Sequence, residues 1–207
     1  MNNTNKRERL IDSAAVLFHQ NGLNITALAD IAKHADIPIG NVYYYFKTKQ
    51  ELALAAITKR REQFSAAYNL LDENIADPRE RLVQAVKYYD TVRADYARYG
   101  CPVGKMIDDL DTEKDDVAKM AANIFSDFMS WSEKQFKQLG HENEARTYAT
   151  TLLTSIQGAV LVAKAMCDQQ LLSQEMSRIT NWLEQMPNKR IPLGKAGFKL
   201  NEQAVPA

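Results

Sequence analysis

The chain has 207 residues, 26 basic and 26 acidic side chains, and a hydrophobic fraction of 45%. A chain of this length forms one or two domains and buries a sizeable core. Charged residues begin at Lys6, and no segment approaches the roughly 18 apolar residues of a membrane span, so we expect neither a signal peptide nor membrane insertion. Only two cysteines, Cys101 and Cys167, argue against a disulfide framework and favour the cytoplasm.

The zero net charge conceals a difference between the two parts of the chain. Residues 1–63 hold nine Lys or Arg against six Asp or Glu, whereas residues 64–207 hold 17 against 20. The first part therefore carries a charge of +3 and the second −3. This sign is typical of a DNA-binding head on an acidic body.

The first predicted helix, residues 5–21, places Leu10, Ile11, Ala14, Leu17 and Phe18 on one face and ends at Gly22. Next comes TALADIAKHADIPIGNVYYYFKTK, residues 26–49, which we interpret as a helix-turn-helix. Thr26 is expected to cap the first of its helices, with the turn at Ala35-Asp36 and Ile37 filling the angle. Pro38 suits the start of a second, short helix that displays Asn41 and three tyrosines.

The rest of the chain has helical periodicity, with strong start signals. Thr48-x-x-Glu51 is a capping box that opens a helix to about residue 72, and Asp77-Pro78 opens another that continues to residue 99. A short helix over 103–110 follows, and two long amphipathic stretches are separated by Gly140. We find no strand pattern, so the predicted fold is all-α. The remaining predicted helices and the tail span 113–139, 143–168, 173–186 and 187–207.

The first 60 or so residues resemble the DNA-binding head of TetR family transcriptional regulators. The matching pattern is Leu17-Phe18…Gly22, Thr26…Ile31-Ala32…Ala35, Gly40, Tyr43-x-Tyr45-Phe46, Lys47-x-Lys49 and Glu51-Leu52. The remainder matches in helicity and length alone. The resemblance implies a homodimeric repressor with an N-terminal three-helix head and a C-terminal helical bundle for ligand binding and dimerisation. The implied domains are 1–48 for DNA binding, 49–72 as linking helix, 73–190 for ligand binding and dimerisation, and 191–207 as tail.

The head supplies the candidate contacts to a double-stranded DNA operator. Asn41 and Tyr43 are placed nearest the base edges, and phosphate contacts are expected from lysine ammonium and tyrosine hydroxyl groups. Gly40 is expected to let the helix approach the DNA, whereas Pro38 and Ile39 replace polar and basic residues common in the family. The alternatives are that Tyr43 packs in the core and that the lysines are solvated. The candidate DNA-binding residues are Arg7, Thr26, Gly40, Asn41, Tyr43, Tyr44, Tyr45, Lys47 and Lys49.

The body is expected to dimerise and to bind an effector. Small residues in 143–168 predict, with 173–186, a four-helix dimer interface; ordinary intramolecular packing is the alternative. Aromatic residues and methionines between 78 and 168 predict a pocket for a hydrophobic or aromatic molecule, with core packing again the alternative. The interface candidates are Ala145, Ala149, Ser155, Gly158, Ala159, Ala163, Ile179, Trp182, Leu183 and Met186, and the pocket candidates are Tyr88, Tyr89, Tyr96, Met106, Phe125, Phe128, Met129 and Trp131.

Cys101 lies between Gly100 and Pro102, where backbone N–H groups at a helix start favour a thiolate. A Gly-Cys at the start of the sixth helix resembles a branch of the family that responds to electrophiles or redox changes. A repressor that acts through Cys101 is therefore the alternative function, and a buried structural thiol is the alternative for the residue itself. Cys167 is expected in the core.

Two other function classes are alternatives to a ligand-responsive repressor. An architectural or activating DNA-binding protein would have the same head without an effector pocket. An enzyme is not expected, because His19, His34 and His141 are scattered and no metal-ligand spacing, phosphate loop or nucleophile–base motif is present. We accordingly expect no catalytic residue, no metal and no cofactor.

Overall fold

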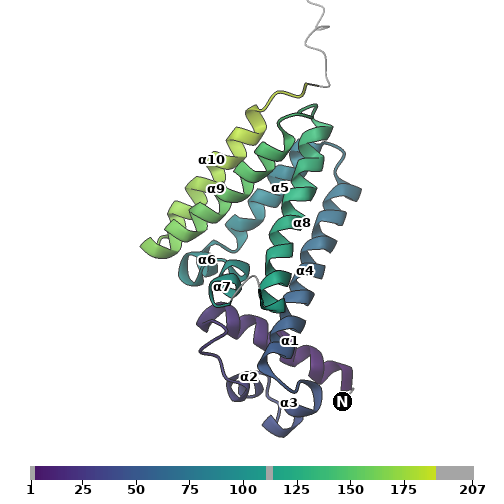
Figure 1. Cartoon of the computed structure of the whole chain (residues 1–207). Helices are drawn as coiled ribbons and strands as arrows, with labels where there is room; N and C mark the ends of the chain where they lie inside the picture. Colours follow the sequence, from purple (N-terminus) through teal and green to yellow (C-terminus); the bar gives the residue numbers. More distant parts are fainter. Residues whose placement is uncertain (1–2, 111–113, 190–207) are drawn as a thin grey trace, which may run out of the picture.

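The computed structural model describes residues 3–110 and 114–189, and within these ranges it is built of helices and their connections, which confirms the predicted all-α fold (Figure 1). The predicted tail, residues 191–207, lies outside the described residues. The helices are α1 (Asn3–Asn21), α2 (Leu28–His34), α3 (Ile39–Tyr45), α4 (Lys49–Asn74), α5 (Pro78–Thr91), α6 (Arg93–Tyr99), α7 (Pro102–Asp108), α8 (Asp116–Gln138), α9 (Ala145–Met166) and α10 (Gln169–Gln185).

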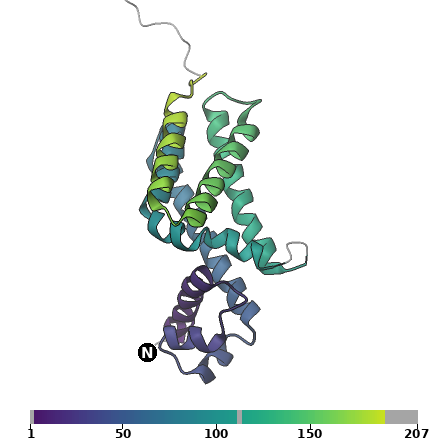
Figure 2. The ribbon, with the colours of Figure 1, turned by 90° about the vertical axis from the view of Figure 1, so that its left-hand side faces the viewer.

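The molecule has a small head and a longer body. Helices α1 to α3 form the head at the lower end of Figure 1, and α5 to α10 form the body above it. Helix α4 begins in the head and extends up one side of the body, where it packs along α8. The view turned by 90° in Figure 2 shows the head as a separate lobe below the body.

Two helix starts follow the sequence signals closely. The Thr48 hydroxyl accepts a hydrogen bond from Glu51 N (3.1 Å), while the Glu51 carboxylate accepts one from Lys47 N (2.7 Å). Asp77 caps α5 by accepting from Arg79 N (3.0 Å), and Pro78 occupies the first helical position. These side chains satisfy amide groups that have no partner inside their helices.

Three predicted boundaries are wrong. Thr26 does not cap α2, because its buried hydroxyl donates to the carbonyls of Gly22 (2.7 Å) and Leu17 (3.3 Å), and Ala27 occupies the capping position. The helix expected over 78–99 is interrupted at Val92, which separates α5 from α6. Helix α10 begins four residues before the predicted start at 173, because the Asp168 carboxylate caps it.

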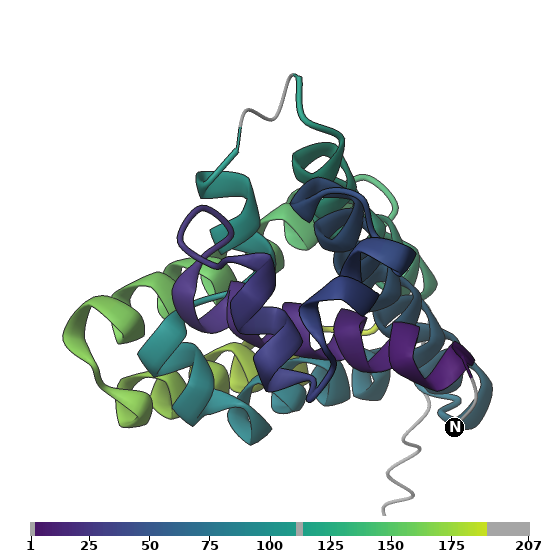
Figure 3. The same ribbon diagram turned by 90° about the horizontal axis from the view of Figure 1, so that it is seen from below.

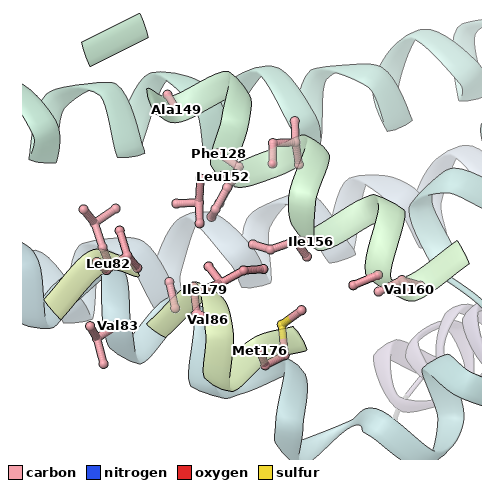
Figure 4. Close-up of a cluster of buried hydrophobic side chains, with 14 of the residues drawn as sticks. Leu82, Val83, Val86, Phe128, Ala149, Leu152, Ile156, Val160, Met176 and Ile179 are labelled. Carbon is pink, nitrogen blue, oxygen red and sulfur yellow. The ribbon is translucent and has the colours of Figure 1, made fainter. Parts of the chain in front are cut away.

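The body core lies where α5, α8, α9 and α10 meet (Figure 4). Ala145, Ala149, Ala159 and Ala163, which the sequence assigned to the dimer interface, are buried in this core, and so are three of the α10 candidates. The intramolecular alternative therefore holds for them: small residues on α9 let α8 and α10 pack closely. The α10 candidates buried here are Ile179, Leu183 and Met186.

Cys167 is exposed, which contradicts its expected place in the core. It follows the last residue of α9 and has a left-handed backbone, with φ of +52°. The apolar pattern continues up to this residue, but the chain turns here before Asp168 starts the next helix. The side chain is thereby carried away from the core.

A second core fills the head and continues into the body. Leu10, Phe18, Ile31 and Leu52 form its head side, while residues of α7 and α8, among them Met106, close it from the body side. Met106 therefore does not line an effector pocket as predicted. Because one continuous apolar cluster spans both parts, the head cannot move freely without disrupting packed contacts.

Polar contacts reinforce this junction between the head and the body. The Asp109 carboxylate accepts from Leu23 N (2.8 Å), and the Asn24 amide donates to Asp109 O (3.2 Å). Lys105 Nζ donates to Gln20 O (3.1 Å). Gly22 has a φ of +93°, and Asp109 Oδ2 lies 2.9 Å from the place where its Cβ would stand. Both the left-handed backbone and this close contact disfavour a side chain at position 22.

One described helix, α9, is long and apolar enough by composition to cross a membrane, although the sequence predicted no such segment. Within its most apolar stretch of 18 residues, 39% is buried inside the molecule. One face of α9 packs against α6, α8 and α10, and the rest of the helix, including several apolar side chains, is exposed.

The junction predicts the effect of removing the Asp109 carboxylate. Asp109→Ala leaves the buried Leu23 N–H without its partner, so we expect a loss of about 1–3 kcal/mol in the free energy of unfolding. Urea denaturation followed by circular dichroism measures this loss. Asp108→Ala, at the exposed neighbouring position, is the matched control and should change stability by less than about 0.5 kcal/mol. Equal stability of the two variants would contradict the assignment.

Candidate nucleic-acid interface and effector cavity

The turn between α2 and α3 is held from outside by α1. The Arg9 guanidinium donates to the carbonyls of Ala35 and Asp36, and it lies 3.6 Å from the Asp36 carboxylate. Asp36 has a left-handed backbone, with φ of +50°, which makes the tight angle between the helices. Ile37 is buried in that angle, as the sequence predicted. Arg9 thus fixes the direction of α3 relative to α1.

Helix α3 presents an aromatic surface at the free end of the head, nearest the viewer in Figure 3. Tyr43 and Tyr44 are exposed, with 69% of Tyr44 accessible to solvent, whereas Asn41 is half-buried. Nothing lies within 4 Å of the place where a Gly40 Cβ would stand, so the surface at Gly40 is open to an approaching ligand. A seven-residue helix of this kind fits a DNA major groove.

Tyr45 and Arg7 lie beside this surface, along the groove between α1 and α4. The Tyr45 ring meets Tyr44 edge-on, with 5.0 Å between ring centroids. The Arg7 guanidinium lies 5.2 Å from the centroid of the Phe46 ring and 3.5 Å from the Glu8 carboxylate. Both predicted contact residues are therefore ordered by the head itself before any nucleic acid arrives.

The two predicted phosphate-binding lysines are anchored by backbone carbonyls. Lys47 Nζ donates to Tyr43 O (2.7 Å) at the end of α3. Lys49 Nζ donates to Leu23 O (2.8 Å) and Asn24 O (3.2 Å), and so ties α4 to the loop after α1. An ammonium group has three donors, so each lysine keeps capacity for a phosphate oxygen while also holding the head together.

Thr26 is set apart from the other candidates, since only 2% of it is exposed and its hydroxyl serves the two carbonyls named above. Lys33 and His34 on α2 and Gln50 on α4 are also exposed on the head, and the sequence analysis did not assign them to DNA contact. The periodicity of α2 signals them, because burying Ile31 and Ala32 turns Lys33 and His34 outward.

A cavity of about 440 Å³ opens in the body between α4, α5 and α8. Of the predicted pocket residues, Tyr88, Tyr89 and Phe128 line this cavity. The sequence analysis did not assign the α4 side of this cavity, although Arg60, Phe64 and Ala67 are spaced so that they share one face of a helix. That side is lined by Arg60, Gln63, Phe64, Ala67, Tyr68, Leu70 and Leu71.

The other pocket candidates lie elsewhere. Trp131 is buried behind the cavity, where its ring stacks on Tyr68 at 4.9 Å and its Nε1 donates to Asp72 (3.1 Å). Met129 packs against the body core. Phe125 and Tyr96 line a constriction of about 10 Å³ that adjoins the cavity and shares Phe128 with it. All of these residues are apolar and point inward, and only the relative placement of the helices separates them.

Burial keeps the tyrosines of this region neutral. It raises the pKa of Tyr68 and of Tyr89 far above the ordinary phenol value, and nearby groups add smaller contributions in the same direction. At neutral pH these hydroxyls are protonated, as an ordinary phenol is, and can donate to a ligand.

Cys101 is half-buried at the start of α7, and it packs against both apolar cores. Its Sγ accepts from Gly104 N (3.4 Å), which is the type of contact that was expected to favour a thiolate. Burial has the larger effect and raises the pKa of the thiol above its ordinary value of 9.0. The expected activation of Cys101 is thus reversed, since the apolar surroundings penalise the charged form.

Among the described residues, no three His, Cys, Asp or Glu side chains are grouped so as to hold a metal ion. The described residues form an aromatic and cationic surface on the head and an aromatic cavity in the body, and Lys49 and Phe64 of these two sites are 15 residues apart along α4. At 1.5 Å per residue, Lys49 and Phe64 are separated by about 22 Å.

Two family models match the chain. One, described as "Bacterial regulatory proteins, tetR family", matches residues 10–56. The other, described as "Transcriptional regulator LmrA/YxaF-like, C-terminal domain", matches residues 80–177. The first covers the helix-turn-helix and the start of α4, and the second covers most of the body.

Similar proteins and structures agree with these matches. An HTH-type transcriptional regulator from the lacX 3′ region of Lactococcus lactis subsp. lactis is 24% identical, over 89% of this chain and 96% of the relative. The HTH-type transcriptional regulator LmrA of Bacillus subtilis (strain 168) is 25% identical, over 76% of this chain and 85% of its own. A solved TetR family regulator from Agrobacterium tumefaciens has the same fold, with a TM-score of 0.75 at 21% identity, over 87% and 98% of the two chains.

The anchored lysine leads to a test of the interface. Lys49→Ala should weaken binding to every DNA sequence and reduce the slope of log affinity against log salt by about one unit. Asn41→Ala should instead change the preferred base at one position, at a cost of about 1–3 kcal/mol, and leave the salt slope unchanged. Fluorescence anisotropy titrations at several salt concentrations distinguish the two effects. If Lys49→Ala lowers thermal stability while the salt slope stays the same, Lys49 only ties α4 to the loop.

Cys101 gives a prediction with a defined pH dependence. Because its pKa is raised above 9.0, the thiol should be protonated at pH 7–8 and should react with iodoacetamide appreciably only as the pH rises past about 9. Labelling followed by mass spectrometry in the Cys167→Ser protein, which lacks the exposed thiol, measures the rate. Rapid labelling at pH 7 would show instead that Cys101 is an activated thiol.

Proposed function

The chain belongs to the TetR family of DNA-binding transcriptional regulators, and on this basis we propose that it is a homodimeric repressor released from a palindromic operator by a hydrophobic or aromatic small molecule. The observation that carries the proposal is the course of α4. Helix α4 begins in the DNA-binding head, at Lys49, and forms one wall of the aromatic cavity. The proposed domains are residues 1–48 for DNA binding, 49–72 as linking helix and 73–190 for ligand binding and dimerisation, and the proposed location is the cytoplasm.

The proposed dimer interface is the outer face of α9. Gly158, Leu161, Val162, Ala165 and Met166 are exposed at helical spacing, and 67% of Leu161 and of Met166 is accessible. Exposed aliphatic side chains in one row are typical of a surface that a partner covers. In an isologous dimer the row meets its own copy.

The polar neighbours of this row support the same face. Thr150 and Thr154 are exposed on α9, and each hydroxyl donates to the carbonyl four residues earlier at 2.9 Å. Their polar atoms are thus satisfied inside the helix, which leaves the methyl groups to face a partner. A dimer through this face would carry two α3 helices, which must lie about 34–36 Å apart to enter successive major grooves.

Effector binding would then act as a population shift. A molecule in the cavity displaces α4 and α5 and favours a dimer whose heads are not spaced for DNA. The loss of operator affinity is set by the difference between the effector's affinities for the two forms of the dimer. Because the head and the body share one core, movement of α4 is transmitted to the reading surface. A repressor that acts through Cys101 has less support, since burial disfavours the thiolate.

The proposal predicts that dimerisation and operator binding are lost together. Leu161→Glu places a carboxylate in the middle of the exposed row, so we expect a monomer in sedimentation velocity and at least about a hundred-fold weaker binding to DNA flanking the gene for this protein, located first by footprinting. Leu70→Glu, which is exposed on α4, is the control and should stay dimeric. A Leu161→Glu protein that remains dimeric would rule out the α9 face.

A further inference from the structure

We propose that the cavity takes a flat aromatic molecule that bears one carboxylate, and that Arg60 binds this carboxylate. The inference rests on the proposed function, which assigns the effector to this cavity, and goes further by naming the effector's chemistry. It starts from the charge balance of the lining. Among the described residues that line the cavity, Arg60 is the one that carries a charge.

The Arg60 guanidinium has no counter-ion in the described part of the chain: no hydrogen bond or ion pair there involves it. The neighbouring cation, Arg61, differs sharply, because its Nε and Nη2 donate to the two oxygens of Asp127 at 2.6 and 3.1 Å. Arg60 is nevertheless half-buried among aromatic rings. A desolvated guanidinium without an anion is costly, and a planar carboxylate is the partner that its two parallel N–H groups fit best.

The charge of Arg60 lies toward the inner, head-facing side of the cavity. Burial is the main reason that the pKa of His19 is lowered, and the positive charge of Arg60 lowers it further. The same charge partly opposes the effect of burial on the Cys101 thiol. A cationic effector would be repelled from this end, whereas an anion would be attracted to it.

The walls define the rest of the ligand. The Phe64 and Tyr68 rings are nearly parallel, at an angle of 13°, and the Tyr88 ring stands edge-on to Phe64 at 88°. Beyond Phe128 the space narrows to about 10 Å³, which stops a bulky molecule from passing deeper. Walls built of several aromatic rings favour a flat aromatic ligand that packs against their open faces and edges. The Gln84 amide already donates to Glu80 (2.6 Å), so its carbonyl oxygen remains to accept a bond.

Trp131 makes binding measurable without DNA. Its ring stacks on Tyr68, which lines the cavity, so a ligand against Tyr68 should change its fluorescence. The probes are three aromatic acids and their uncharged amides: benzoate and benzamide, 2-naphthoate and 2-naphthamide, and biphenyl-4-carboxylate and its carboxamide. Titration of the full-length Trp182→Phe protein isolates the Trp131 signal. We expect at least one acid to bind about ten-fold or more tightly than its amide.

Two variants test the role of Arg60. Arg60→Gln should weaken the acid to the affinity of its amide and leave the amide unchanged, and Arg60→Lys should restore part of the preference. Arg61→Gln is the matched control and should keep the full preference, since Arg61 is paired with Asp127. Equal binding of acids and amides to the unmodified protein would overturn the proposal, and so would an acid preference that survives Arg60→Gln, or binding of no probe.

A gel-shift assay with the footprinted DNA separates this inference from the proposed function. Acid binding that depends on Arg60 but leaves the DNA complex intact supports the ligand site and contradicts release by this effector. Release by a neutral or cationic aromatic compound, with no preference for acids, supports the repressor function and overturns the assignment of the carboxylate to Arg60.

Discussion

The rest of the structure depends on one constraint, which is that α4 is a single unbroken helix shared by two cores. Leu52, Ala53 and Ile57 are buried in the head, and the same helix turns Phe64 and Tyr68 toward the body. A helix is stiff over this length, so a displacement at one end is felt at the other. The sequence secures the start of α4 by the Thr48 cap and leaves its later turns free of glycine and proline.

The junction of the head and the body resists small displacements but can change between alternative packing arrangements. Packed apolar side chains resist small deformations, and they exchange between discrete arrangements more readily than they stretch. The Asn24–Asp109 and Lys105–Gln20 contacts are solvent-exposed, so water can replace them at low cost when the helices shift, whereas the buried Leu23 N–H depends on the Asp109 carboxylate. Asp109 and Lys105 both contact α1 or the loop after it, so a rotation of the head would change these hydrogen bonds.

The sequence predicted features that depend on neighbouring residues alone. The caps at Thr48 and Asp77 are local hydrogen bonds, and the inward face of each long helix follows from its period. Which apolar residue lines a cavity depends on how helices are placed, so Tyr88 and Trp131 could not be distinguished in advance. For Cys101, the N–H donors are visible in the sequence, whereas the burial that raises the pKa of its thiol is a property of the fold.

In the proposed dimer, the exposed row on α9 has a consequence for the choice of partner. Leu161, Val162 and Met166 are aliphatic or thioether side chains, so they contribute hydrophobic contact area but no pattern of charges. A surface of this kind does not distinguish its own copy from a closely related regulator made in the same cell. Discrimination would have to come from polar residues around the row. A bacterium that carries several such proteins would thus keep their signals separate through a few rim residues, or else obtain mixed dimers that read hybrid DNA sites.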